Sequence, residues 1–259
     1  MLSQKSVKLS FSRSAKKYAK YAALQKDVSM RLVKDFVPPA IDQPKKILDV
    51  GCGTGFTAMD AKRRWRNSGL AAVDIAAPMA LEAKKAGISQ AAVADAAVLP
   101  FKDGAFDLVV SSLVFQWAFF TGPLFDELAR VMVKGGRIFF STLGPGTLKE
   151  LRDAYNTACL ECTGKPALFK SMPGKDDLAE KMINAGFNEI SSTFQTVVRS
   201  YPSVHDFFKT LKGTGATLPG RPENPPRRDV LAKTIERYSS SGSPVNATYE
   251  VIYISGRRI

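Results

Sequence analysis

Cysteine and histidine are scarce in this sequence, which has three cysteines and one histidine among 259 residues. An odd and sparse set of cysteines excludes a disulfide framework and fits a reducing cytoplasm, which is where we expect the protein to act. Cys159 and Cys162 form a CxxC, but without a second pair or a clustered histidine they supply half of a zinc site, so we expect no metal. His205 alone offers little to a Ser-His-Asp mechanism or a histidine metal site, and we interpret it as structural.

Long apolar runs are absent as well. No stretch approaches the roughly 20 consecutive apolar residues of a membrane span, and no apolar segment typical of a secretory signal follows the N-terminus. Acidic residues are missing from the first 26 positions, which hold seven Lys or Arg. That composition is typical of an organellar transit peptide or of a basic helical arm, and we favour the arm.

Positive charge is the feature in excess. The 37 Lys and Arg residues outnumber the 24 Asp and Glu residues, which gives a formal net charge of +13. A field of that size attracts acidic partners, so nucleic acid, an anionic membrane and an acidic protein are all candidates. The alternative is a solvated basic surface without a partner.

The order of the predicted elements indicates an α/β fold. Helical periodicity runs from residue 14 to residue 37, before Pro38 and Pro39, and an apolar strand follows at 46–50. Further strands are predicted at 70–75, 91–94, 106–111, 137–142, 187–198 and 248–255, and helices at 78–86, 124–131 and 175–185. Because strands that alternate with helices form crossover units, most of the sheet should be parallel. We divide the chain into an N-terminal helical arm (1–40), a core (41–200), a small helical cap with a mobile loop (201–245) and a final core strand (246–259).

A glycine-rich turn follows the first predicted strand, in Asp49-Val-Gly51-Cys-Gly53-Thr-Gly55. Glycine lets the backbone turn sharply and approach a ligand closely, and the helix that follows offers unpaired N–H groups to an anion. A dinucleotide-binding fingerprint would need a glycine at position 56, which is Phe56. The spacing resembles motif I of class I methyltransferases. It implies a Rossmann-like fold with a mostly parallel seven-stranded sheet, and S-adenosylmethionine as the cofactor.

The resemblance also implies roles for residues around this cofactor. The loop holds the methionine part in that class, with Asp49 near the cationic sulfonium and amine. Asp74 would accept the ribose hydroxyls, Asp95 and the next backbone amide would receive the adenine, and Ile75 and Met79 would flank its ring. Each has a structural alternative, which is a helix cap for Asp74, a turn for Asp95 and core packing for the apolar pair. The complete predicted set is Asp49, Gly51, Gly53, Gly55, Asp74, Ile75, Met79, Asp95, Ala96 and Ser112.

Segments outside the cofactor motifs carry a more specific likeness. They are Phe11 to Gln25, Ser112 to Trp117, Phe140 to Thr142, Leu148 to Leu151, Leu211 to Thr217 and Ala247 to Tyr249. Nearly end to end, the chain resembles the BioC family, the malonyl-[acyl-carrier protein] O-methyltransferases of biotin synthesis, with Tyr18 and Gln25 at matching positions. It departs from that family in its linkers, notably the Pro-rich segment 219–228 and the basic end at 257–259.

This second resemblance implies methyl transfer to the free carboxylate of a malonyl thioester, and an acidic acyl carrier protein as the partner of the basic surface. A carboxylate with a pKa near about 4 is already ionised at neutral pH, so the reaction needs no general base. Tyr18 and Tyr249 are candidates to aim the carboxylate, Gln116 and Trp117 to form the pocket floor, and Lys212 to bind the carboxylate or the phosphopantetheine phosphate. Core packing is the alternative for the aromatic residues, and a solvated loop charge for Lys212.

Two other classes of function stay open. One is a methyltransferase for a different small carboxylate or a quinone precursor, and the other is a non-catalytic protein that binds S-adenosylmethionine or nucleic acid. The sequence has no RNP-like aromatic motif and no helix-turn-helix signature, so we disfavour nucleic acid. We also expect no membrane partner.

Overall fold

The computed structural model describes residues 4–41, 43–118, 123–167, 171–216, 227–240, 242 and 244–259. Seven strands form a sheet in the order β3-β2-β1-β4-β5-β7-β6. Their bounds are Lys46–Val50 (β1), Gly69–Asp74 (β2), Ala91–Val93 (β3), Phe106–Ser112 (β4), Met132–Leu143 (β5), Phe187–Tyr201 (β6) and Val245–Arg258 (β7). Strands β1 to β5 pair in parallel, whereas β7 is antiparallel to both β5 and β6. The predicted α/β fold with a mostly parallel sheet is confirmed.

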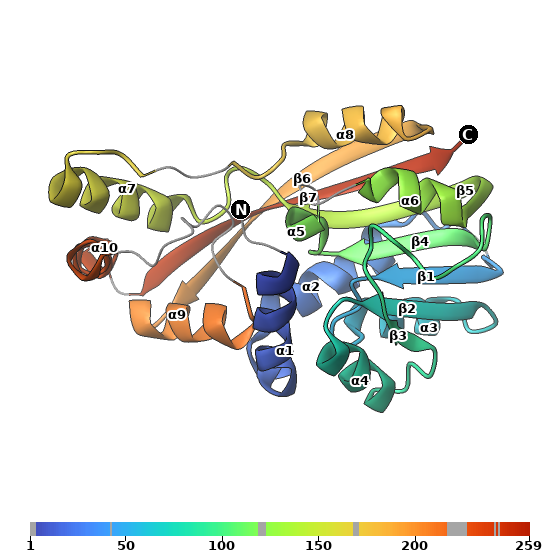
Figure 1. Ribbon diagram of the computed structural model, residues 1–259, viewed down its shortest axis with the longest axis horizontal. Coiled ribbons are helices and arrows are strands. Elements are labelled where there is room, and N and C mark those ends of the chain that lie inside the picture. The colour runs from blue at the N-terminus through green and yellow to red at the C-terminus, as the bar shows by residue number, and fades with distance from the viewer. Residues whose placement is uncertain are drawn as a thin grey trace.

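Helices cover both faces of this sheet (Figure 1). They are Gln4–Tyr21 (α1), Ala23–Arg31 (α2), a π-helical turn at Leu32–Phe36, Phe56–Arg64 (α3), Ala77–Lys85 (α4), Phe115–Ala118 (α5), Leu124–Val131 (α6), Lys149–Thr163 (α7), Lys175–Asn184 (α8), Val204–Gly213 (α9) and Arg228–Ser240 (α10). Successive residues of β1 point to opposite sides, so Ile47 packs with residues of α2 and α3, and Leu48 packs with residues of α5, α6 and α8. Parallel strands buried on both faces need apolar side chains on both sides, which explains the continuous apolar run of β1.

The strand order reverses between β1 and β4. In open parallel sheets, ligands bind in the crevice at the carboxyl ends of the strands beside such a point. The two strand ends are also tied together here, because the Ser111 hydroxyl donates a hydrogen bond to the Val50 carbonyl at 2.7 Å. The topology therefore places the glycine-rich loop at the edge of the sheet where ligands bind in folds of this kind.

The N-terminal arm differs from the single helix predicted at 14–37. It begins at Gln4, breaks at Ala22, where φ is −90° and ψ is 36°, and continues through α2 and the π-helical turn. It ends before Pro38, as predicted. The start is earlier because the apolar stripe continues toward the N-terminus at helical spacing, through Val7 and Phe11.

The segment predicted as a helical cap, 201–245, contains α9 and α10, and α7, which precedes that segment and was not predicted, packs beside α10. The three helices gather at one end of β6 and β7, at the left of Figure 1, where Val245 to Glu250 of β7 pair with β6 alone. Helices α7 and α10 are joined by ion pairs from Glu161 to Lys233, at 3.3 Å, and to Arg237. Thr217 and most of the Pro-rich segment 219–228, with its expected mobile loop, lie outside the described residues.

Candidate active site

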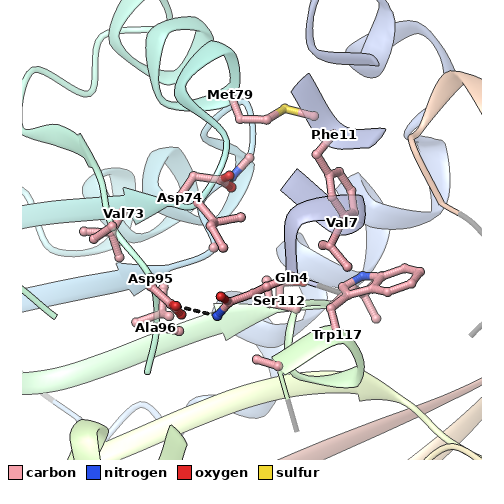
Figure 2. A pocket seen from close by; sticks show the side chains of 18 of the residues that line it. Gln4, Val7, Phe11, Val73, Asp74, Met79, Asp95, Ala96, Ser112 and Trp117 are labelled. Carbon is pink, nitrogen blue, oxygen red and sulfur yellow. Dashed lines mark hydrogen bonds between the residues drawn. The ribbon is translucent and has the colours of Figure 1, made fainter. Parts of the chain in front are cut away.

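A cavity opens at the carboxyl ends of β1, β2 and β4. Figure 2 shows its wall, to which the sheet edge contributes Asp74, Asp95 and Ser112, and helix α1 contributes Gln4 and Phe11. Eight of the ten residues predicted to bind the cofactor line it, namely Gly51, Gly53, Asp74, Ile75, Met79, Asp95, Ala96 and Ser112. Asp49 and Gly55 belong to the same loop region but do not line the cavity.

Each of the three glycines of the loop is required for a different structural reason. Gly51 has φ +73°, and a Cβ there would lie 2.3 Å from Val114 Cγ2, so the strand end and the segment after β4 approach closely only with glycine. Gly53 has φ +52°, and among the described residues other than its chain neighbours only Tyr18 comes within 4 Å of an added Cβ, with Cε1 at 3.9 Å. Its backbone therefore faces open cavity, where a ligand can come close. Gly55, at φ +96°, packs against α4 instead.

The Asp74 carboxylate is buried at the end of β2 and is hydrogen-bonded to the backbone of the glycine-rich loop. Oδ2 accepts the backbone N–H of Gly53 at 2.9 Å, and Oδ1 accepts that of Ala76 at 2.8 Å. Burial raises the pKa of Asp74, while these two N–H groups lower it. Ala76 itself is the N-cap residue of α4, so Asp74 shapes the turn before the helix rather than capping it. A carboxylate oxygen accepts more than one hydrogen bond, so both oxygens keep capacity for a pair of hydroxyls.

Asp49 is a buried carboxylate, and neither oxygen makes a hydrogen bond of normal geometry with the described residues. Burial raises its pKa to about 8; the nearby Ala58 backbone N–H lowers the pKa in part, and the Asp74 charge raises it further. An unpaired buried carboxylate is costly unless a cation compensates it. The site therefore fits a ligand that brings positive charge to the glycine-rich loop, which the sulfonium and amine of S-adenosylmethionine both do.

Helix α1 closes the side of the cavity opposite β2. Gln4 donates a side-chain hydrogen bond to Asp95 (Figure 2). The Asp95 carboxylate also accepts the Ala97 backbone N–H at 3.0 Å. The Phe11 ring packs edge-on against Trp117 at a centroid distance of 5.8 Å. Asp95 is thus both a turn residue and a polar group of the cavity. Sequence reasoning assigned no role to Gln4, Val7 or Phe11, although the apolar stripe of α1 carried the signal.

A second cavity lies next to the first, and the two share Phe11, Tyr18, Leu113 and Trp117. Four of the five predicted acceptor residues line it, namely Tyr18, Gln116, Trp117 and Tyr249. Residues of α2, β6 and α9 complete the wall, and among them sequence reasoning missed Arg199 and Tyr201. The predicted cofactor-binding and acceptor-binding residues therefore line two adjoining cavities, and Phe11 and Tyr18 of α1 belong to the wall between them.

The polar groups of the second cavity are largely held in place. The Gln116 amide donates to the Leu113 carbonyl at 2.7 Å and accepts from the Thr142 hydroxyl at 3.0 Å, so this side chain is rigid. The hydroxyls of Tyr249 and Tyr201 lie 3.5 Å apart. Burial is the main cause that raises the pKa of both Tyr18 and Tyr249 above the usual range of tyrosine. Both phenols stay protonated and remain hydrogen-bond donors at neutral pH.

Lys212 lies outside both cavities, exposed in the last turn of α9. The residues that follow it dock α1 onto the cap. A Cβ at Gly213 would lie 2.2 Å from Tyr21 Cδ2, and the Gly215 carbonyl accepts the Ser10 hydroxyl at 2.8 Å. The segment that resembles the BioC family around Leu211 therefore positions the helix that both cavities share.

The cysteines show no sign of chemistry. Cys52, Cys159 and Cys162 are free thiols. Burial raises the pKa of the Cys52 thiol, which packs among small apolar residues of α3 and α4. Among the residues that the structure describes, no three His, Cys, Asp or Glu side chains gather where they could hold a metal ion.

Comparisons with known proteins agree with this geometry. A family profile described as a methyltransferase domain matches residues 48–140. The malonyl-[acyl-carrier protein] O-methyltransferase of Halorhodospira halophila is 32% identical over 97% of this chain and 87% of that protein. The protein of the same name from Geobacter sulfurreducens is 32% identical over 100% of both chains. A solved S-adenosylmethionine-dependent methyltransferase from Thermotoga maritima shares the fold, with a TM-score of 0.56 at 17% identity over 97% of this chain and 99% of that one.

The fold, the glycine-rich loop and the domain match together define a class I methyltransferase. Within that class, the chain belongs to the malonyl-[acyl-carrier protein] O-methyltransferase family. The predictions of the fold class, of a methyltransferase and of S-adenosylmethionine as its cofactor are confirmed.

Proposed function

We propose that this chain transfers the methyl group of S-adenosylmethionine to the free carboxylate of a malonyl thioester on an acyl carrier protein, as a step of biotin synthesis. The observation that carries the proposal is the pair of cavities that meet at Phe11, Tyr18, Leu113 and Trp117. One cavity has the acidic residues that a cationic nucleoside cofactor needs, and the other has hydroxyl donors suited to an anionic acceptor. The identity of the substrate is inferred from relatives that match nearly the whole chain and are named for this activity.

S-adenosylmethionine supplies an electrophilic methyl group when it is bound. Gly51 and Gly53 would let its methionine part approach the backbone, while the negative charge of Asp49 favours its cationic groups. Asp74 would accept the ribose hydroxyls with the capacity left on its two oxygens. At the far end, Asp95 would receive the adenine amino group in place of the Gln4 amide.

The protein's task in the second cavity is to orient the acceptor and exclude water. The carboxylate is ionised at neutral pH, so no side chain has to remove a proton. Tyr18 lines both cavities and would donate a hydrogen bond where the two reactants meet. Tyr249 would donate a second, and the rigid Gln116 with Trp117 forms the floor. Lys212 would bind the phosphopantetheine phosphate outside the cavity.

The partner would be an acidic carrier protein that docks on the basic surface. Lys16, Lys17 and Lys20 are exposed on α1, and Lys20 lines the second cavity. This use of the positive charge involves neither nucleic acid nor a membrane. None of the described helices is long and apolar enough to cross a membrane. The free thiols fit our placement of the reaction in the reducing cytoplasm.

A direct assay tests reaction and substrate together. The purified protein is incubated with methyl-labelled S-adenosylmethionine and malonyl-carrier protein, beside acetyl-carrier protein and malonyl-coenzyme A. We expect label in an ester and production of S-adenosylhomocysteine with the malonyl substrates only. Equal labelling of the acetyl control, or labelling of unrelated small carboxylates alone, would refute the proposed acceptor and favour a different small-molecule methyltransferase.

A further inference from the structure

Arg199 of β6 lines the second cavity together with the acceptor residues named above. Its Nη2 donates to the carboxylate of Asp27 on α2, which fixes the guanidinium group from outside. Its Nε is buried and has no hydrogen-bond partner among the described residues. A buried charged donor left unpaired is costly, so the guanidinium group lacks a compensation that an anion in the cavity would supply.

The neighbours of Arg199 fit an anion. Arg199 pairs with Ala247 across the β6–β7 ladder, which makes Tyr249 its diagonal neighbour on the same face. The positive charge of Arg199 reaches that hydroxyl, because it lowers the pKa of Tyr249 against the larger raising effect of burial. The other cation of this wall, Lys20, is exposed.

We propose that Arg199 binds the carboxylate of the acceptor with its guanidinium group, beside the Tyr249 hydroxyl, and so selects acyl thioesters that end in a carboxylate. This inference rests on the proposed function for the identity of the acceptor. It gives the carboxylate a receptor inside the cavity, whereas Lys212 lies outside it. Asp27 is a positioning residue, since it holds the guanidinium group without lining the cavity.

The chemistry predicts which kinetic constant Arg199 controls. A lone pair of the carboxylate oxygen forms the new bond to the methyl carbon, and the electron pair of the breaking S–CH3 bond stays on sulfur. A carboxylate and a sulfonium become a neutral ester and a neutral thioether, and no proton moves. Because negative charge is lost on the way to the transition state, an adjacent cation stabilises the bound reactant at least as much as the transition state. Arg199 should therefore lower KM and contribute little to kcat.

The test compares Arg199→Gln, Arg199→Lys and Asp27→Asn with the natural protein, using malonyl-pantetheine as acceptor. We expect Arg199→Gln to raise KM by about tenfold or more with kcat within about twofold, as for a lost charge-assisted hydrogen bond made in the ground state. Arg199→Lys should recover part of the loss. Asp27→Asn keeps the charge on Arg199 and should raise KM far less. Affinity for S-adenosylmethionine should stay unchanged in all three.

Arg31→Gln is the matched control, because Arg31 also joins α2 to β6, through Gln195 at 3.2 Å, but lines neither cavity. It should leave both constants unchanged. If Arg199→Gln lowers kcat and leaves KM unchanged, or if Asp27→Asn reproduces its full effect, Arg199 has a structural role and the inference is wrong.

A binding experiment separates this inference from the proposed function. Calorimetry in the presence of S-adenosylhomocysteine compares malonyl-pantetheine with its neutral methyl ester. The natural protein should prefer the carboxylate, and Arg199→Gln should lose that preference while it still binds both. If Arg199→Gln loses the preference but the natural protein does not methylate malonyl thioesters, the anion site is supported and the proposed reaction is refuted. An active enzyme whose preference survives Arg199→Gln would refute the anion site alone.

Discussion

The carboxylate of Asp74 accepts the backbone N–H of Gly53 at 2.9 Å, so one residue both shapes the glycine-rich loop and faces the ligand cavity. Asp74→Ala should weaken S-adenosylmethionine binding by about 1–3 kcal/mol, because it removes a charge-assisted acceptor. Asp74→Asn should lose less, since the amide oxygen still accepts. Calorimetry on folded variants measures both. Asp107→Ala is the control, because Asp107 accepts a backbone N–H at 2.8 Å outside the cavity and should not affect the ligand. Unchanged affinity in Asp74→Ala would remove Asp74 from the site.

Gly53 tests whether the loop backbone contacts the cofactor. Gly53→Ala places a methyl group in the cavity, on a residue with φ +52°. Gly104→Ala places one in open space, on a residue with a similar φ of +59°. Both should lose similar stability, on the order of 1 kcal/mol, for a left-handed backbone. Only Gly53→Ala should lose affinity for S-adenosylmethionine, and Gly53→Val should lose more. Thermal unfolding and calorimetry together distinguish the two effects. Equal cofactor affinity in the two alanine variants would contradict the assigned loop.

Asp49 should make ligand binding and stability depend on pH. Its pKa is about 8 in the folded protein against an ordinary 3.8, so the ligand-free fold keeps a proton that the unfolded chain releases. The free energy of unfolding should therefore fall as pH rises from about 4 to 8, with the full contribution present below that window. A bound cation favours the ionised form, so S-adenosylmethionine binding at pH 7 should release a proton from Asp49. Calorimetry in buffers of different ionisation enthalpy measures this release.

The Asp49→Asn variant provides the comparison for both effects. It should unfold with less pH dependence over the same range and should bind S-adenosylmethionine more weakly. Proton release that persists unchanged in Asp49→Asn would come from the ligand's own amine or from another side chain.

Gly213 tests the docking of α1 on the cap. Alanine favours a helix over glycine, so α9 itself should tolerate Gly213→Ala, but the new Cβ would lie 2.2 Å from the Tyr21 ring. We expect faster hydrogen exchange in α1 and weaker binding of both substrates. The double variant Gly213→Ala, Tyr21→Ala removes the clash and should show a favourable coupling between the two positions. Gly174→Ala, whose Cβ would come within 3.4 Å of a carboxylate oxygen only, should leave α1 unchanged.

The basic surface should act on encounter rather than on chemistry. Salt shortens the Debye length to about 8 Å at physiological ionic strength, so added salt should lower kcat/KM for malonyl-carrier protein far more than for malonyl-pantetheine. Reversing the charges of Lys16, Lys17 and Lys20 should have the same selective effect. The matched control reverses Lys45, Lys46 and Lys134, which are exposed at the opposite edge of the sheet, where β1 and β5 begin. Identical salt slopes for the two acceptors would reopen nucleic acid and membranes as partners.

The parts of the fold that could be predicted are those whose strand, turn and motif residues lie close together in the sequence. The turn from Gly51 to Gly55 directly follows a buried strand, and Asp74 ends the next one, so pattern and motif agree. Helix α7 was not predicted, although Leu151 and Ala158, seven residues apart on one helix face, are buried. It packs mainly on α10, which starts 79 residues further along the chain, with ion pairs from Glu161. Arg199 could not have been found in this way. Its partner Asp27 lies 172 residues earlier, so its role depends on tertiary structure alone.

The wall that both cavities share divides the site into positions that can and cannot vary independently. A substitution at Phe11, Tyr18, Leu113 or Trp117 changes the surroundings of donor and acceptor together, so a gain for a new acceptor there competes with retention of the cofactor. Gln25, Arg199 and Tyr201 line the acceptor cavity alone. Directed evolution toward other acyl chains should therefore accumulate changes at Gln25 and Tyr201 first and keep Arg199, because every acceptor still carries the carboxylate.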